Sequence, residues 1–287
     1  MFKSKIVTLA KISMGGKLIP NVLGPKEFYH LITDLSLLTR AQSAQEFKAR
    51  ALPHLTTPDG KPIGLFGNLT IYDKEGNIDK QQTSAMLTHH ASGQNITGIS
   101  FSEQIGIYTF LSLMSGKPIL LANPQNIPND YKHVPPSIVS DEGGIQDMGG
   151  AEIVGAMEKE MTVDLLPLTA VIGHVTLSPN LSKDFLKVVI NPEFYYVDLD
   201  DTHLPEQVRD LHEEYCCDLI KAKKSPDKIE LKKGATKTFL EMQSIYQAYQ
   251  LKRLQDVNAP EEQLAKIKEL VDKLPQKASQ VYSKPKL

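Results

Sequence analysis

The spacing of apolar residues changes near residue 200, and this change limits which folds the chain can adopt. Before residue 200, the apolar segments are short and are bounded by glycine, proline and asparagine, a pattern typical of strands. After it, apolar residues recur at intervals of three and four, which is typical of amphipathic helices. We therefore expect an α+β protein, with a mixed or antiparallel sheet in residues 1–200 and a helical region in residues 201–287.

The individual elements can be placed from the same patterns. Strands are expected at 6–10, 64–72, 98–102, 118–122, 160–166, 170–177, 186–190 and 194–199, and two helices among them at 25–38 and 103–114. Three further helices are expected after residue 200. The last should begin with Asn258 as its N-cap and Pro260 in its first turn, and should end at Pro275, before a mobile tail at 276–287.

Charge and cysteine content exclude several classes of protein. The 32 Lys and Arg residues nearly balance the 34 Asp and Glu residues, so we expect no nucleic-acid binding through an overall basic field. The two cysteines, Cys216 and Cys217, are too few for a disulfide framework or a cysteine-rich zinc site. No apolar run approaches a membrane span or the core of a signal peptide, so we expect a soluble protein from a reducing compartment, with no transmembrane segment.

A segment without helix or strand periodicity, residues 123–157, precedes two glutamates. It contains four prolines and five glycines and ends at Glu158-Lys159-Glu160. Long segments of this kind are often functional loops. In an extended chain Glu158 and Glu160 share one face, where their like charges repel, so a purely structural sheet gains little from them. The alternative is a pair of solvated carboxylates at a strand edge.

Two other short segments carry candidate polar residues. Arg40 ends an apolar run and is either a site residue or a surface ion-pair partner. Ser100 and Ser102 share one face of a short strand. Ser102 can also serve as the N-cap of a helix that begins at Glu103, and the two roles are compatible.

Taken together, these segments resemble a known family. The order Arg40, Ser100-Phe101-Ser102 and Glu158-Lys159-Glu160 resembles the mono-ADP-ribosyltransferases of the arginine–serine–glutamate class, which includes cholera-toxin-like enzymes. The likeness covers roughly residues 30–180. Phe101 stands where threonine is common, and the insertions between the motifs match no pattern of the family, which leaves the protein target open.

The resemblance implies a split-sheet ADP-ribosyltransferase-like core and a reaction in which NAD is the substrate. ADP-ribose would pass from NAD to a protein, with release of nicotinamide and without a metal. Glu160 would stabilise the positive charge on the ribose in an oxocarbenium-like transition state. Glu158 would orient an acceptor arginine and accept its proton, so the resemblance favours transfer to an arginine side chain.

The remaining site residues are also implied by the resemblance. Ser100 would hold Glu160 by a hydrogen bond, and Arg40 would contact the phosphates or a ribose of NAD. The Ala41 backbone would bind the nicotinamide amide. Ser102, His89 and His90 would line the NAD site, although the two histidines can equally be surface residues.

Two other functions stay open at this point. A NAD glycohydrolase would use water as the acceptor, and a catalytically inactive relative would act as a binding module. By analogy with toxins, we expect an effector that a dedicated bacterial secretion system delivers into the host cytosol, or otherwise a cytoplasmic protein. The basic stretch 221–233 should be a solvated face, or else should bind an acidic partner or lipid.

Overall fold

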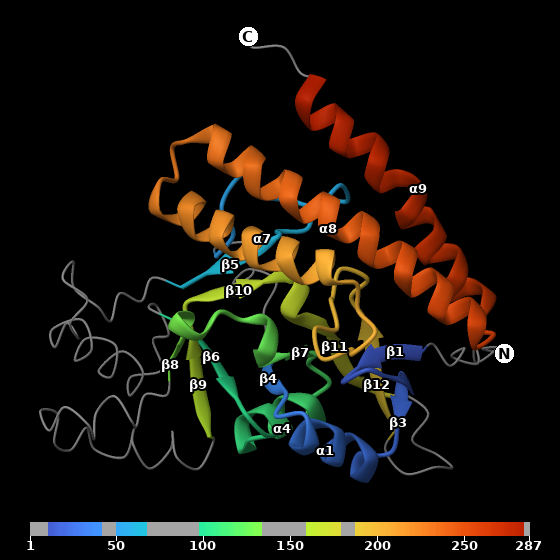
Figure 1. Ribbon diagram of the computed structural model, residues 1–287. Coiled ribbons are helices and arrows are strands. Elements are labelled where there is room, and N and C mark those ends of the chain that lie inside the picture. Colours follow the sequence, from blue (N-terminus) through green and yellow to red (C-terminus); the bar gives the residue numbers. More distant parts are fainter. Residues whose placement is uncertain (1–10, 42–49, 68–97, 134–158, 179–186, 284–287) are drawn as a thin grey trace, which may run out of the picture.

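The computed structural model describes residues 11–41, 50–67, 98–133, 159–178 and 187–283, with the backbone alone at 107–108, 133, 160 and 275–283. A twisted sheet lies between two groups of helices (Figure 1). Helices α7 (Glu206–Lys224) and α8 (Ile229–Asp256) cross one side, and α1 (Pro25–Asp34) and α4 (Ile107–Met114) lie on the other. Helix α9 (Glu261–Ser283) runs beside α8, and no helix among the described residues is long and apolar enough to span a bilayer.

Eight strands form the main sheet, in the order β3-β12-β11-β7-β4-β6-β9-β8. Their bounds are β3 Val22–Leu23, β4 Leu38–Ala41, β6 Ile99–Ser102, β7 Ile119–Ala122, β8 Lys132–His133, β9 Glu160–Val163, β11 Val171–Leu177 and β12 Val188–Pro192. Two smaller sheets pair β1 (Lys11–Met14) with β2 (Lys17–Pro20), and β5 (Gly64–Phe66) with β10 (Leu165–Pro167). The pairings between named strands in the described part of the chain are all antiparallel.

The main sheet has a hydrophobic core on each face. Strand β7 shows why, because its four residues are all buried and alternate between the two faces. Leu120 belongs to the cluster under α7 and α8, which includes Phe101, Tyr215 and Phe239. Ile119 and Leu121 belong to the second cluster, which includes residues of α1 and α4. The helical C-terminal region is therefore packed directly onto the sheet.

Glycines set the turn of the β1–β2 hairpin. Gly15 and Gly16 both have positive φ, 56° and 74°, as a two-residue type I′ loop requires. Side chains other than glycine rarely adopt this conformation, so the pair fixes the hairpin register of Met14 opposite Lys17.

The structure confirms the α+β class and the helical region after residue 200, and it selects an antiparallel sheet. One predicted strand is wrong: residues 194–199 form turns and irregular chain. The helix predicted from Glu103 begins at Ile107 with Gly106 as its N-cap, so Ser102 does not cap it. The predicted strand at 6–10 and most of 64–72 lie outside the described residues.

The last helix boundary also differs from the prediction. Asn258 has φ 49° and its amide donates to the carbonyl of Gln255, so it ends α8 in the left-handed conformation that often closes helices. It is not the N-cap of α9. Helix α9 continues through Pro275 to Ser283, although an internal proline removes one amide donor and crowds the carbonyl four residues earlier. The predicted tail is thus helical to Ser283.

Candidate functional site

The three strands that carry the predicted site residues are neighbours in the main sheet. β6, with Ser100 and Ser102, lies between β4, with Arg40, and β9, which begins at Glu160. Ser102 is paired with Thr39 on one side and with Glu160 on the other. Segments far apart in the sequence therefore meet at one row of the sheet.

The ladder between β4 and β6 ends after a single residue pair. β4 pairs with β7 along all four of its residues, whereas its pairing with β6 is confined to Thr39 opposite Ser102. One residue further along β4, the Arg40 Nη1 donates a hydrogen bond to the carbonyl oxygen of Ser100 at 2.5 Å. A guanidinium thus supplies a donor to this carbonyl, and it brings a positive charge between two strands.

The segment after β6 is held against both neighbouring strands. Thr39 Oγ1 donates to the Gln104 carbonyl at 3.0 Å, and the Glu103 amide donates to the Lys159 carbonyl at 3.0 Å. Ser102 is buried at this point, with 8% of its surface exposed. The chain from Ser102 to Gln104 is therefore fixed beside the start of β9.

Lys159 changes the geometry expected for the two glutamates. Its φ is 45°, in the left-handed region, and β9 begins only at the next residue. The strand alternation that would give Glu158 and Glu160 a common face does not extend across Lys159, so that argument is wrong. A non-glycine residue in this conformation costs roughly 1–2 kcal/mol, and such strain is concentrated at functional sites.

The described residues include part of the predicted set. Arg40, Ala41 and Ser100 are half-buried, and Ser102 is buried. Glu160 is placed by its backbone pairing with Ser102. Glu158, His89 and His90 lie outside the described residues, as do residues 134–157 of the proline- and glycine-rich segment. Residues 123–133 of that segment contain two 3-10 helices and β8.

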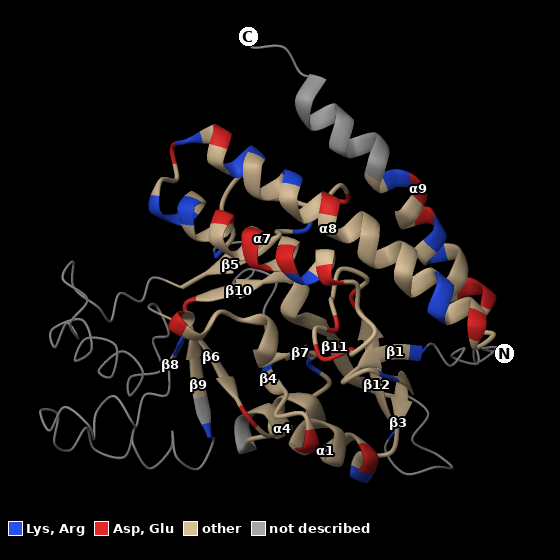
Figure 2. Ribbon diagram, in the orientation of Figure 1, with Lys and Arg blue, Asp and Glu red and all other residues tan. Residues whose placement is uncertain are grey.

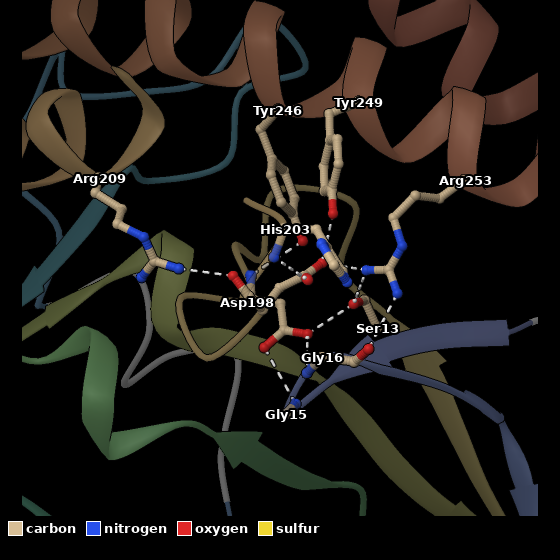
Figure 3. Close-up of polar contacts among 10 residues, drawn as sticks. Ser13, Gly15, Gly16, Asp198, His203, Arg209, Tyr246, Tyr249 and Arg253 are labelled. Atoms are coloured by element: carbon tan, nitrogen blue, oxygen red, sulfur yellow. Dashed lines mark hydrogen bonds and ion pairs between the residues drawn. The ribbon is translucent and has the colours of Figure 1, made fainter. Parts of the chain in front are cut away.

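Sequence reasoning missed a second polar cluster, in which the β1–β2 hairpin meets α8 (Figure 3). The Asp198 carboxylate accepts hydrogen bonds from Ser13 Oγ at 2.6 Å and from the amides of Gly15 and Gly16. Burial raises the pKa of Asp198, against the effect of these donors. The run Asp198-Leu199-Asp200-Asp201 is the only sequence signal, and it falls at a mispredicted strand.

The same cluster contains a buried ion pair. Asp201 is fully buried and pairs with Arg253 of α8, while the Tyr249 hydroxyl donates to the same carboxylate oxygen at 2.8 Å. Arg253 also donates to Ser13 Oγ and to the carbonyl of Gly16. Because both carboxylates are bonded to groups of the protein, the cluster fastens the hairpin to α8.

Two further features are part of the packed interior. Cys216 is buried, and burial raises the pKa of its thiol to about 12, which opposes formation of a reactive thiolate. Its neighbour His212 contacts Thr169 Oγ1, and burial lowers the pKa of the imidazole to about 4. In the part of the chain that the structure describes, no group of His, Cys, Asp or Glu side chains could hold a metal ion.

A cavity of about 40 Å³ lies between β1, α8 and α9. Gln250 lines it, and its Nε2 has no hydrogen-bond partner among the described residues. The volume suits two or three water molecules, at roughly 10–15 Å³ each, and is far too small for a dinucleotide. This cavity is therefore not a candidate site for NAD.

Comparison of the chain with known proteins identified no relative. No protein-family model, curated protein or solved structure matches the chain.

Proposed function

We propose that this protein is a mono-ADP-ribosyltransferase that transfers ADP-ribose from NAD to an arginine side chain of another protein. One observation carries the proposal: the strands bearing Arg40, Ser100 and Glu160 are consecutive in one sheet, in the order β4, β6, β9. The sequence likeness requires these three residues to act at one site, and strands that are neighbours in one sheet can meet this requirement.

The chemistry of NAD cleavage fits the residue types at this row. The bond between nicotinamide and ribose breaks with nicotinamide leaving as a neutral molecule, so the step needs no general acid. Positive charge grows on the ribose, and a fixed carboxylate lowers the energy of that charge. Glu160 is the candidate, because it occupies the position opposite Ser102.

Arg40 suits the anionic part of the substrate. A guanidinium binds phosphate oxygens through a planar fork of donors, and it keeps its charge at all physiological pH values. The bond from Arg40 to the Ser100 carbonyl fixes its position at the point where the β4–β6 ladder ends. The Ala41 backbone, at the end of β4, is proposed to bind the nicotinamide amide, as it would in the resembling enzymes.

The acceptor is assigned from Glu158. An arginine is a poor nucleophile because its guanidinium holds its proton, and a second carboxylate can orient it and accept that proton as the new bond forms. The likeness to toxins supports a target inside a host cell, which a bacterial secretion system would allow the protein to reach.

Incubation of the purified protein with labelled NAD and a host-cell lysate tests the proposal. We expect release of nicotinamide and a labelled protein band whose linkage has the hydroxylamine sensitivity of ADP-ribosyl-arginine. Glu160→Gln should lower the rate about 10²- to 10³-fold, the scale for losing one preorganised electrostatic group. Glu241→Gln, an exposed glutamate of α8, is the matched control and should keep the wild-type rate.

The outcomes separate the candidate functions. Glu158→Gln should reduce transfer to arginine more than it reduces NAD hydrolysis, and equal losses would contradict its acceptor role. Nicotinamide release without a labelled band would favour a NAD glycohydrolase. Absence of both products would contradict both enzymatic functions and favour a binding module.

A further inference from the structure

The strand that begins at Glu160 is followed directly by a buried aspartate. Asp164 comes after β9, and its backbone amide donates to the Tyr131 carbonyl at 3.0 Å. Its own carbonyl accepts from the Gly67 amide at 2.8 Å. The side chain of Asp164 is only 8% exposed, so this point joins three segments of the chain inside the protein.

The Asp164 carboxylate pairs with a lysine of the C-terminal helical region. Lys223 Nζ, in the last turn of α7, lies 2.5 Å from Asp164 Oδ2, and the lysine side chain is 25% exposed. Helix α7 is itself anchored in the core beneath it by Tyr215 and Leu219, both with no exposed surface. The ion pair therefore connects the end of β9 to a rigid element.

Other lysines of the basic stretch pair differently. Lysines gather where α7 meets α8 (Figure 2). Lys221 pairs with Asp218 of its own helix, and Lys233 pairs with Glu230 of its own helix. Both pairs lie within one helix and both lysine side chains are exposed, and such pairs contribute little to stability. The pair of Lys223 is distinct because it crosses from a helix to the sheet.

Strand β9 needs such an anchor because it is short. It has four residues, and on its outer side it pairs with only two residues of β8. Glu160 lies at the opposite end of the strand from Asp164, about 13 Å away at 3.3 Å per residue. A shift of β9 along β6 would move Glu160 away from its position opposite Ser102.

We propose that Lys223 is a positioning residue: through its ion pair with Asp164 it holds β9 in register, and so holds Glu160 opposite Ser102. This inference rests on the proposed function. It also gives the C-terminal helical region a role in the proposed reaction, because this region would help to position Glu160. Misplacement of a catalytic group by about 1 Å can lower a rate as much as 10²-fold, so a modest movement of β9 is sufficient for a measurable effect.

The test compares Lys223→Met with Lys223→Arg, which keeps the charge, and with Lys221→Met as the matched control on the same helix. Amide hydrogen exchange is measured for Met161–Val163, and nicotinamide release from NAD gives kcat and KM. For Lys223→Met we expect at least tenfold faster exchange in β9, no change in β11, and about a tenfold lower kcat with an unchanged KM. Lys223→Arg and Lys221→Met should resemble the wild type.

Several results would overturn the proposal. Unchanged exchange in β9 and unchanged kcat would do so, as would equal acceleration of exchange in β9 and β11, which signifies only a global loss of stability. If Lys223→Met does not fold, Asp164→Asn replaces it, because the amide oxygen still accepts a bond from Lys223 while the ion pair is lost. A wild-type protein without nicotinamide release would contradict the proposed function, whereas the exchange measurement tests the anchoring by Lys223 independently.

Discussion

Replacement of Arg253 by methionine should lower the free energy of unfolding by about 3–5 kcal/mol, the usual cost of removing one partner of a buried ion pair. The structure gives three reasons for a value in this range. The partner, Asp201, has no exposed surface and would keep a buried charge without its cation. The hydrogen bonds from Arg253 to Ser13 and to the Gly16 carbonyl would be lost as well.

The loss should be visible as a lower melting temperature. An unfolding entropy of about 2.1 cal/mol/K per residue gives about 0.6 kcal/mol/K for the 287-residue chain, so the melting temperature should fall by about 5–8 °C. Urea unfolding gives the free energy directly. Lys252→Met, an exposed neighbour on α8, is the control and should change the free energy by less than about 0.5 kcal/mol.

A double variant tests the reasoning more closely. Asp201→Asn combined with Arg253→Met removes both charges, so it should be less destabilising than the sum of the two single variants. An Arg253→Met protein that melts within 1 °C of the wild type would refute the assignment of this ion pair as a fastening of the hairpin to α8.

Three other perturbations test the packing of the fold. Phe239→Ala should cost about 3–5 kcal/mol by urea unfolding, since the ring is fully buried between two tyrosines. Gly173→Ala should destabilise by at least 1–3 kcal/mol, because its Cβ would lie 2.1 Å from the Asn191 carbonyl oxygen on the paired strand; a neutral effect in the same assay would contradict the close approach of β11 and β12. His212 has a pKa of about 4 when folded and 6.5 when unfolded, so stability is complete above pH 6.5 and falls as the pH decreases toward 4. Between pH 7 and 5, wild type should lose about 2 kcal/mol more than His212→Asn, and parallel pH profiles would contradict the burial of this imidazole.

The sequence predicted the fold well where local pattern and tertiary packing agree. The β7 segment, Ile119–Ala122, is an apolar run between turn residues, and it forms a fully buried central strand. The segment 194–199 has a similar pattern and forms no strand. Its carbonyls at Phe194 and Tyr195 accept bonds from Gln247 and Gln243 of α8. Such long-range partners satisfy the backbone without a sheet, and nothing local in the sequence reveals them.

At the candidate site, too, some features were predicted from the sequence, and others depend on contacts between distant segments. The likeness predicted that Arg40, Ser100 and Glu160 would act at one site, and this stays a prediction. Their strands are neighbours, but Ser102 rather than Ser100 is opposite Glu160, and Arg40 is out of phase with Thr39 in the alternation of β4. The left-handed conformation of Lys159 was not predictable, since it depends on the contact of its carbonyl with the Glu103 amide in another segment. The fastening of the hairpin by Asp198 was missed for a related reason, because its donors lie 182–185 residues earlier in the chain.

A crystal structure of the Glu160→Gln variant grown with NAD tests the central claim most directly, because this variant should bind NAD and cleave it slowly. The account predicts that the nicotinamide ribose lies beside the row formed by Thr39, Ser102 and residue 160, with the diphosphate within hydrogen-bonding distance of Arg40. NAD bound elsewhere, or no NAD at millimolar concentration, would contradict it.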